Sequence, residues 1–286
     1  MTSRRLVFAL ALSGLGLMSC DPAAGVVNKP DEPKPDTVLP DTGWELVWQD
    51  EFDGPAGTLP ASERWMPEVG GDGWGNGQYE YNTNRAQNAS LDGEGNLAIT
   101  ARRERYQGND YTSARLSTKG RFTHTYGRIE ARLKLPTGRG IWPAFWMLGA
   151  DVDQVGWPQC GEIDIMEHRG QIPSIVRSSL HGPGYSGGQN LGREHAVGGG
   201  TLQSDFHVYA VEIEPNRVRF MLDETVYFEA TPDNLPNNRK WVYDHPFFII
   251  LNVAVGGSFV GPTDSTTVFP QTMKVDYVRV YARPTP

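Results

Sequence analysis

The sequence predicts an all-β fold, a jelly-roll sandwich of two curved antiparallel sheets. Apolar and polar residues alternate with a period of two in most of the hydrophobic segments, as in strands with one face against a core. The 33 glycines and 21 prolines among 286 residues interrupt the chain too often for a mostly helical protein. Many short strands in one domain are typical of a sandwich or a barrel.

Each predicted strand follows from this pattern in the order of the chain. The turn Pro215-Asn216 separates two alternating segments and therefore predicts a hairpin. Residues 247–255 are nearly all apolar, which is expected of a central strand that is covered on both faces. No segment shows the 3.6-residue period of an amphipathic helix. The segments that alternate, predicted as half-buried strands, are residues 44–48, 128–134, 209–213, 218–222 and 275–281.

Composition and charge narrow the classes of function. Hydrophobic residues make up 38% of the chain, enough for a sizeable core, and a mean hydropathy of −0.45 excludes a polytopic membrane protein. The 34 acidic and 26 basic residues give a net charge of −8. Nucleic-acid binding requires clustered cations, so nucleic acid is not an expected partner and a neutral ligand is favoured. A monomer is expected.

The N-terminus has the pattern of an export signal. Arg4 and Arg5 precede an apolar run over residues 6–18 that is too short to span a bilayer comfortably. The run ends in Leu-Met-Ser-Cys, which resembles the lipobox of bacterial lipoproteins. We therefore expect a lipoprotein-type signal peptide over residues 1–20, acylation of Cys20 and attachment of the protein to a membrane of the cell envelope. The alternative is an ordinary signal with an incidental cysteine, which would release the protein outside the cell.

The segment after the signal is a linker. Residues 21–40 contain five prolines among charged and small residues, a composition that favours an extended tether. One domain, residues 41–286, follows without a further linker or repeat. With Cys20 acylated, Cys160 is the one cysteine left, so no intramolecular disulfide is expected.

Three carboxylates within six residues form the motif with the most chemical content. Glu162 and Asp164 share one face of a predicted strand, whereas Glu167 lies at an odd offset and would face the other way. One extra residue at Ile165 or Met166, a β-bulge, would return Glu167 to the same face. Crowded carboxylates cannot all ionise, so one is expected to stay protonated beside an ionised neighbour, as glycoside hydrolysis requires. The alternative is the solvated face of an edge strand.

An aromatic segment, residues 140–149, precedes the acid motif. If it is extended, Trp142 and Trp146 share one face, and Phe145 and Met147 take the core face. Indole rings stack on the apolar faces of pyranose rings, so the pair predicts a sugar-binding groove. The alternative is that both tryptophans belong to the core.

Three other patterns are set aside. Residues 151–162 approach the calcium loop of an EF-hand, but Val155 provides no ligand oxygen and Pro158 interrupts the loop. Residues 184–188 match G-x-S-x-G without the strand and helix that a nucleophile elbow needs. The six histidines show no spacing typical of a zinc site.

With these motifs the sequence resembles glycoside hydrolase family 16, and within it the laminarinase-like bacterial endo-1,3-β-glucanases. The acid motif matches the pattern E-x-D-x-x-E, the bulged form of laminarinases, agarases and carrageenases. The resemblance implies a concanavalin A-like jelly roll, Glu162 as nucleophile, Asp164 as its electrostatic partner and Glu167 as general acid and base, with retention of configuration. The other matching segments are residues 49–54, 73–76, 140–149, 179–183 and 275–281.

The resemblance also implies binding residues and a structural ion. A calcium ion, structural rather than catalytic, is expected at Glu51, Asp276 and a backbone carbonyl near Gly95, and no cofactor is expected for catalysis. His168 and Arg169 follow the acid motif and are expected to tune the pKa of Glu167. The residues expected to bind substrate are Trp142, Trp146, Asn76, Arg85, Trp157 and His181.

The predicted function is retaining, endo-acting hydrolysis of β-1,3-glucosidic bonds in laminarin-like or mixed-linkage β-glucans. Another polysaccharide hydrolase of the family, an agarase, carrageenase or lichenase, is the alternative within the same chemistry. The acidic chain disfavours the sulfated substrate of a carrageenase. A non-catalytic β-glucan-binding protein is the alternative from another class.

Overall fold

The computed structural model describes residues 43–236 and 239–283. The predicted signal peptide, the linker and the acylated Cys20 lie outside the described residues. None of the helices within the described ranges has the length and apolar character needed to cross a membrane.

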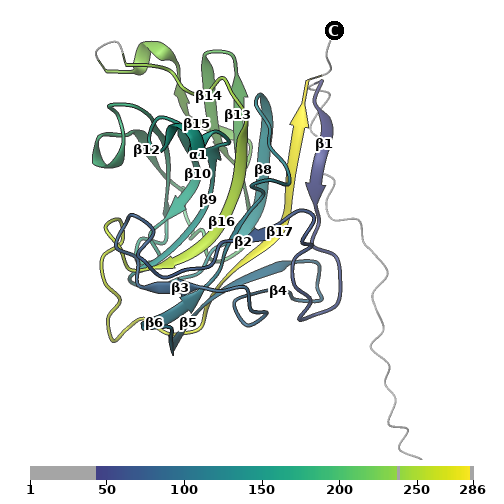
Figure 1. Ribbon diagram of the computed structural model, residues 1–286, viewed down its shortest axis with the longest axis vertical. Helices are drawn as coiled ribbons and strands as arrows, with labels where there is room; N and C mark the ends of the chain where they lie inside the picture. Colours follow the sequence, from purple (N-terminus) through teal and green to yellow (C-terminus); the bar gives the residue numbers. More distant parts are fainter. Residues whose placement is uncertain (1–42, 237–238, 284–286) are drawn as a thin grey trace, which may run out of the picture. The chain divides into compact units, whose positions relative to one another are not determined.

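The described residues form two sheets, which confirms the predicted all-β sandwich. The order in one sheet is β15-β14-β13-β8-β17-β5-β6-β3, with β1 paired to β17 and β4 to β5. Figure 1 shows its long strands β8, β13 and β17 side by side. The strands of this ten-stranded sheet are β1 (Glu45–Asp50), β3 (Glu80–Asn82), β4 (Ala89–Leu91), β5 (Leu97–Tyr106), β6 (Asn109–Ser113), β8 (Gly127–Lys134), β13 (His207–Glu214), β14 (Arg217–Leu222), β15 (Thr225–Ala230) and β17 (Gln271–Ala282).

The other sheet has seven strands in the order β12-β11-β10-β9-β16-β7-β2. Its strands are β2 (Met66–Pro67), β7 (Arg115–Ser117), β9 (Ile141–Gly149), β10 (Glu162–His168), β11 (Ile175–His181), β12 (Leu191–Ala196) and β16 (Phe247–Val255). Helical structure among the described residues is limited to α1 (Val152–Val155) and the 3₁₀ turns Gly187–Gln189 and Pro232–Asn234.

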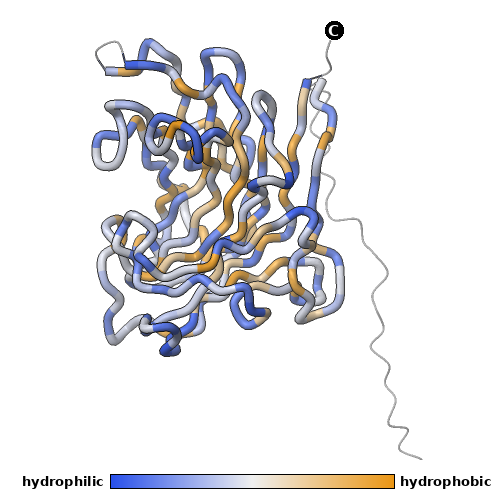
Figure 2. Tube along the Cα trace, viewed as in Figure 1, coloured by the Kyte–Doolittle hydropathy of each residue, from blue (hydrophilic) through white to orange (hydrophobic). Residues whose placement is uncertain are grey.

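The two sheets share one hydrophobic core. It joins Ile129 and Leu133 of the ten-stranded sheet to Phe145 and Ile163 of the seven-stranded sheet, all fully buried. Every residue of β16 is buried, and the strand lies between β9 and β7, so the prediction of a central strand is confirmed. Figure 2 shows the apolar stretches along the strands and mostly polar loops. The core therefore fixes which residues of the seven-stranded sheet face away from it.

The predicted hairpin is confirmed as β13 and β14, which pair from Tyr209 opposite Leu222 to Glu214 opposite Arg217. Asn216 adopts a φ of 59°, a left-handed conformation that asparagine tolerates in such turns.

The predicted alternation of burial fails in several strands. Residues 209–213 of β13 and 275–281 of β17 are buried at every position, on both faces of the sheet. β1 forms, but Leu46, which the alternation places on the buried face, is 47% exposed. The reason is that the strand pairs with β17 alone and that its register shifts between Leu46 and Trp48. In β8 two of the polar residues are also buried. Arg128 and Glu130 are 2% and 0% exposed, and the Arg128 Nε donates to Glu130 at 2.8 Å, which compensates both charges.

Candidate active site

A β-bulge in β10 puts the three acids on one face. Against β9, Asp164 lies opposite Trp146 and Met166 opposite Phe145, so one residue of β10 has no counterpart there. The register with β11 shifts between Asp164 and Glu167 as well. Ile165 and Met166 are both fully buried in the core. The predicted bulge is therefore confirmed, and Glu167 lies on the face of Asp164.

His181 of β11 lies beside two of these acids. Its Nε2 is 3.0 Å from Asp164 Oδ2 and 3.7 Å from Glu162 Oε1. The backbone N–H of Gly187 donates to His181 Nδ1 at 3.0 Å, so a neutral ring carries its proton on Nε2 and directs it toward the acids. The arrangement places an imidazole N–H close to two carboxyl groups that would otherwise repel each other.

Two tryptophans donate their indole N–H groups to the two glutamates. Trp157 Nε1 lies 3.0 Å from Glu162 Oε2, and Trp142 Nε1 lies 3.1 Å from Glu167 Oε1. Trp142 comes from β9, the strand next to β10, whereas Trp157 comes from the loop before β10. Each glutamate is thus held by its own donor.

Burial raises the pKa of all three acids. The pKa of Glu162 rises to about 8 and that of Asp164 to about 7, in both cases mainly because burial disfavours the charged form. The pKa of Glu167 rises to about 8, first by burial and then by the charge of Asp164. The trio therefore retains protons near neutral pH, and a protonated acid can stand next to an ionised one.

Trp142 and Trp146 lie on the face of the acids, and Phe145 and Met147 are fully buried in the core, as predicted. Trp142 is 8% exposed and packs on Phe259 with ring centres 5.1 Å apart. The indole ring of Trp142 is therefore largely covered and does not offer the open stacking surface that was predicted. It meets the site through its hydrogen bond to Glu167.

The comparisons with known proteins agree with this geometry. The sequence profile described as "Glycosyl hydrolases family 16" matches residues 76–279. The chain belongs to glycosyl hydrolase family 16. A beta-glucanase of Rhodothermus marinus is 45% identical over 247 residues, which cover 83% of this chain and 85% of that protein. The glucan endo-1,3-beta-glucosidase A1 of Niallia circulans is 36% identical over 292 residues, 89% of this chain and 42% of the relative.

A solved structure resembles this family 16 chain along most of its length. The laminarinase catalytic domain from Thermotoga maritima MSB8 superimposes with a TM-score of 0.80 at 45% identity. The match covers 85% of this chain and 99% of that domain.

Of the four other residues predicted to bind substrate, two contact the acids, and the described contacts of the other two are with different residues. Trp157, 48% exposed, and His181 contact the acids as described. Asn76 is exposed in a turn whose backbone is tied to the loop after β16, where Ser258 N–H donates to the Asn76 carbonyl at 2.9 Å. Arg85 instead donates to Asn88 at 3.0 Å, pairs with Glu104 and lies 4.4 Å from the ring centre of Tyr106. None of its described contacts is with the seven-stranded sheet.

His181 and Arg177 lower the pKa of Glu167, and the expected His168 and Arg169 are not among the causes of its shift. His168 is fully buried, its Nδ1 donates to the Ile175 carbonyl at 2.8 Å, and burial lowers its pKa to about 4. Arg177 lies opposite Glu167 in β11, and its charge lowers the pKa of that glutamate. Arg177 was not predicted because the pairing of β10 with β11 is needed to find it.

The structure adds a buried acid that the sequence did not single out. Glu80 in β3 is 0% exposed, and its Oε2 accepts the Val255 N–H at 2.8 Å. Burial raises its pKa to about 8. It therefore keeps its proton at neutral pH.

Two of the residues expected to hold calcium lie beside the ends of β1 and β5, and Asp276 lies in β17, which pairs with both strands. β17 pairs with β1 as far as Asp50 opposite Val278, and with β5 through Val275 opposite Leu97. Asp276 thus lies where the end of β1 and the start of β5 converge. Two carboxylates and a backbone carbonyl are oxygen ligands of the kind that calcium takes. Both carboxylates also pair with arginines, Glu51 with Arg279 at 2.8 Å and Asp276 with Arg132 at 2.6 Å.

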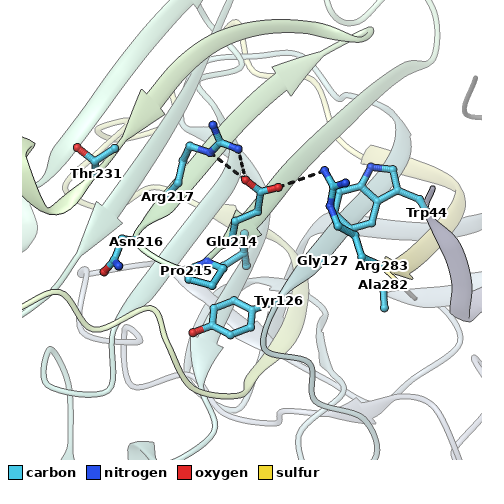
Figure 3. A pocket seen from close by; sticks show the side chains of 11 residues that line it. Trp44, Tyr126, Gly127, Glu214, Pro215, Asn216, Arg217, Thr231, Ala282 and Arg283 are labelled. Carbon is cyan, nitrogen blue, oxygen red and sulfur yellow. Dashed lines mark hydrogen bonds and ion pairs between the residues drawn. The ribbon is translucent and has the colours of Figure 1, made fainter. Parts of the chain in front are cut away.

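One hollow of the described residues lies away from the three acids. It has a volume of about 500 Å³ and lies around Trp44, Tyr126 and Glu214, at the turn between β13 and β14 and the end of β17 (Figure 3). None of the acids of β10 lines it.

Proposed function

We propose that the protein is a retaining endo-1,3-β-glucanase that hydrolyses laminarin-like or mixed-linkage β-glucans. The observation that carries the proposal is the bulge of β10, which puts Glu162, Asp164 and Glu167 on one face with an indole donor on each glutamate. The beta-glucanase and laminarinase relatives support β-1,3-glucan as the substrate.

In this mechanism Glu167 protonates the glycosidic oxygen while Glu162 attacks the anomeric carbon and forms a glycosyl-enzyme ester. Glu167, now ionised, then takes a proton from water, and that water displaces Glu162 from the sugar with overall retention. The step requires Glu162 ionised and Glu167 protonated at the start.

Burial and the charge of Asp164 raise the pKa of both glutamates, whereas His181 and an indole donor lower it in each case. Glu162 is proposed as the ionised partner because His181 Nε2 lies 3.7 Å from its Oε1. A negative charge on Glu162 or Asp164 keeps the proton on Glu167, whose pKa the charge of Asp164 raises. Asp164 thus acts as the electrostatic partner, with His181 Nε2 at 3.0 Å from its Oδ2.

The test is product chromatography after incubation of residues 41–286 with laminarin, mixed-linkage glucan, agarose and κ-carrageenan. The matched control is Glu162→Gln, which keeps the shape of the side chain and removes the nucleophile. We expect laminari-oligosaccharides from the native protein alone, with the β-anomer formed first in NMR spectra. Cleavage of agarose or κ-carrageenan instead would keep the proposed mechanism but would show that the substrate is a galactan. Binding to glucan without any product would establish the non-catalytic alternative.

We also propose export and lipid anchoring through Cys20. The supporting observation is the sequence Leu-Met-Ser-Cys after an apolar run. Fatty-acid labelling of the cells is expected to mark the native protein but not a Cys20→Ala variant. Equal labelling of both would refute the anchor.

Calcium at Glu51, Gly95 and Asp276 is proposed as a structural ion. Addition of a chelator is expected to lower the melting temperature of the native protein and to leave that of Asp276→Asn unchanged. An equal effect on both would argue against this site.

A further inference from the structure

The bulge of β10 leaves one residue without a counterpart in either neighbouring strand. Against β9 the pairing passes from Asp164 directly to Met166, and against β11 it passes from Asp164 to Glu167. Ile165 therefore has no counterpart on either side, and it is fully buried. A bulge interrupts the ladder of backbone hydrogen bonds, and a buried carbonyl without a partner is costly. A donor at the Ile165 carbonyl is therefore expected to stabilise this conformation.

Ser178 of β11 is such a donor. It stands in β11 between the residues that pair with Asp164 and Glu167, and so it faces the bulge. Its Oγ donates to the Ile165 carbonyl at 2.7 Å. Ser178 is 0% exposed, so water does not compete for this hydrogen bond.

The serine hydroxyl is itself held by Tyr227, which comes from β15 at the edge of the other sheet. The two hydroxyl oxygens are 2.5 Å apart. A hydroxyl has one proton, and Ser178 uses it on the carbonyl, so Tyr227 is the donor of this second bond. We call Tyr227, Ser178 and the Ile165 carbonyl the hydroxyl chain. It runs from the ten-stranded sheet to the bulge of the seven-stranded sheet.

A second bulge carries Tyr227. The register of β14 and β15 shifts after Phe220, which lies opposite Phe228, and Tyr227 has no counterpart in β14. Bulges re-aim side chains, which accounts for a tyrosine hydroxyl that reaches across to the other sheet. The ring of Tyr227 also stacks on His195 of β12, with ring centres 4.8 Å apart. The tyrosine therefore has a fixed place from which it donates to the serine.

We propose that Ser178 and Tyr227 are positioning residues that fix the bulge of β10 and thereby set Glu167, after the bulge, relative to the two acids before it. The inference rests on the proposed function. Retaining hydrolysis requires acid and nucleophile about 5–5.5 Å apart, so a small change in the backbone between them impairs proton transfer. Ser178 alternates with Arg177, which lies opposite Glu167, and so its hydroxyl is on the core side of the sheet. The hydroxyl chain acts through the backbone of β10 and not on the sugar.

The first experiment separates proton transfer from nucleophilic attack. Phenyl β-laminaribioside has a poor leaving group that needs the proton of Glu167, whereas the 2,4-dinitrophenyl glycoside releases its leaving group without one. For Ser178→Ala we expect kcat/KM about tenfold lower on the phenyl glycoside and within about twofold of the native value on the dinitrophenyl glycoside. Tyr227→Phe should lose about threefold on the phenyl glycoside alone, because its serine can still donate.

Tyr281→Phe is the matched control. Tyr281 is a tyrosine of the ten-stranded sheet that is 8% exposed, and its hydroxyl donates to Glu130 at 3.3 Å. The variant removes a buried hydrogen bond without touching β10, so it should leave both glycosides unaffected. Ser178→Thr keeps a hydroxyl at the bulge and should recover part of the loss of Ser178→Ala.

A double variant, Ser178→Ala with Tyr227→Phe, tests whether the two hydroxyls act in series. Once the serine hydroxyl is removed, the tyrosine has no route to the bulge. The double variant should therefore match Ser178→Ala within about twofold on the phenyl glycoside. A loss equal to the product of the two single losses would show independent effects and would overturn the hydroxyl chain.

Amide hydrogen exchange is a readout that does not depend on turnover. We expect faster exchange at residues 165–167 in Ser178→Ala and native exchange there in Tyr281→Phe. Native exchange at these residues in Ser178→Ala would overturn the proposal, as would equal losses on the two glycosides or a loss that Tyr281→Phe reproduces. A native protein that cleaves neither laminarin nor the glycosides would refute the proposed function, and the exchange comparison would then decide whether the hydroxyl chain fixes the bulge.

Discussion

The two indole donors should control opposite limbs of the pH profile. Trp157 donates to the proposed nucleophile Glu162, and Trp142 donates to the proposed acid Glu167. A hydrogen bond to a carboxylate stabilises its ionised form, so replacement of either tryptophan by phenylalanine raises the pKa of its partner. The acid limb of kcat/KM reports the group that must be ionised, and the alkaline limb the group that must be protonated.

The size of each shift follows from the burial of the donor. Hydrogen bonds to charged groups contribute about 1.5–3 kcal/mol, and Trp157 is 48% exposed, so the lower end applies. About 1.4 kcal/mol corresponds to one pKa unit, which moves the acid limb of Trp157→Phe upward by about one pH unit. Trp142 is 8% exposed, and a larger value of about 2 kcal/mol moves the alkaline limb of Trp142→Phe upward by about 1.5 units.

The assay is release of reducing sugar from laminarin between pH 4 and pH 10 at substrate concentrations well below KM. Trp157→Phe should become less active in acid and keep its alkaline limb, whereas Trp142→Phe should gain activity in alkali and keep its acid limb. Movement of the same limb by both variants, or of neither, would refute the assignment of one donor to each role.

Two further predictions concern single acids. Glu167→Gln should lower kcat on laminarin by about 10²–10⁴-fold and leave the affinity for laminarihexaose nearly unchanged, as measured by kinetics and calorimetry, because it removes proton transfer and not binding; a loss below tenfold would contradict the role of Glu167. Glu80 has a folded pKa near 8 against an ordinary value of 4.5, so its proton stabilises the folded state in acid and this contribution is lost as pH rises from 4.5 through 8. Glu80→Gln should therefore flatten the decline of stability over that interval in urea unfolding at pH 5 and pH 8, and an unchanged slope would count against a buried, protonated Glu80.

Features that depend on residues close in the chain could be predicted from the sequence. The all-β fold and the hairpin at Asn216 follow from the period of two and from the turn. The bulge follows because Glu167 would otherwise face the core. These inferences use only the order of residues that are close in the chain and the geometry of a single strand.

Features that depend on pairing between distant strands could not be predicted. Periodicity placed Trp142 on the correct face, but it does not reveal that the indole N–H meets Glu167 and that the ring is covered. Arg177 acts on Glu167 from the neighbouring strand β11, so its position requires the order of the sheet. The burial of Arg128 was missed because alternation assumes a solvated face, whereas that face carries an internal ion pair.

The bulge of β10 also has a consequence for how the chain finds its native register. The two halves of the strand are out of phase, with Glu162 and Asp164 before the bulge and Glu167 after it. A slip of the whole strand by one residue along β9 would turn carboxylates toward the interior in both halves, and would turn Ile163 in one half and Met166 in the other toward water. Such misaligned pairings are therefore strongly disfavoured during assembly of the sheet. The strand β10, which carries the proposed catalytic acids, would then also disfavour misaligned strand pairing in the seven-stranded sheet.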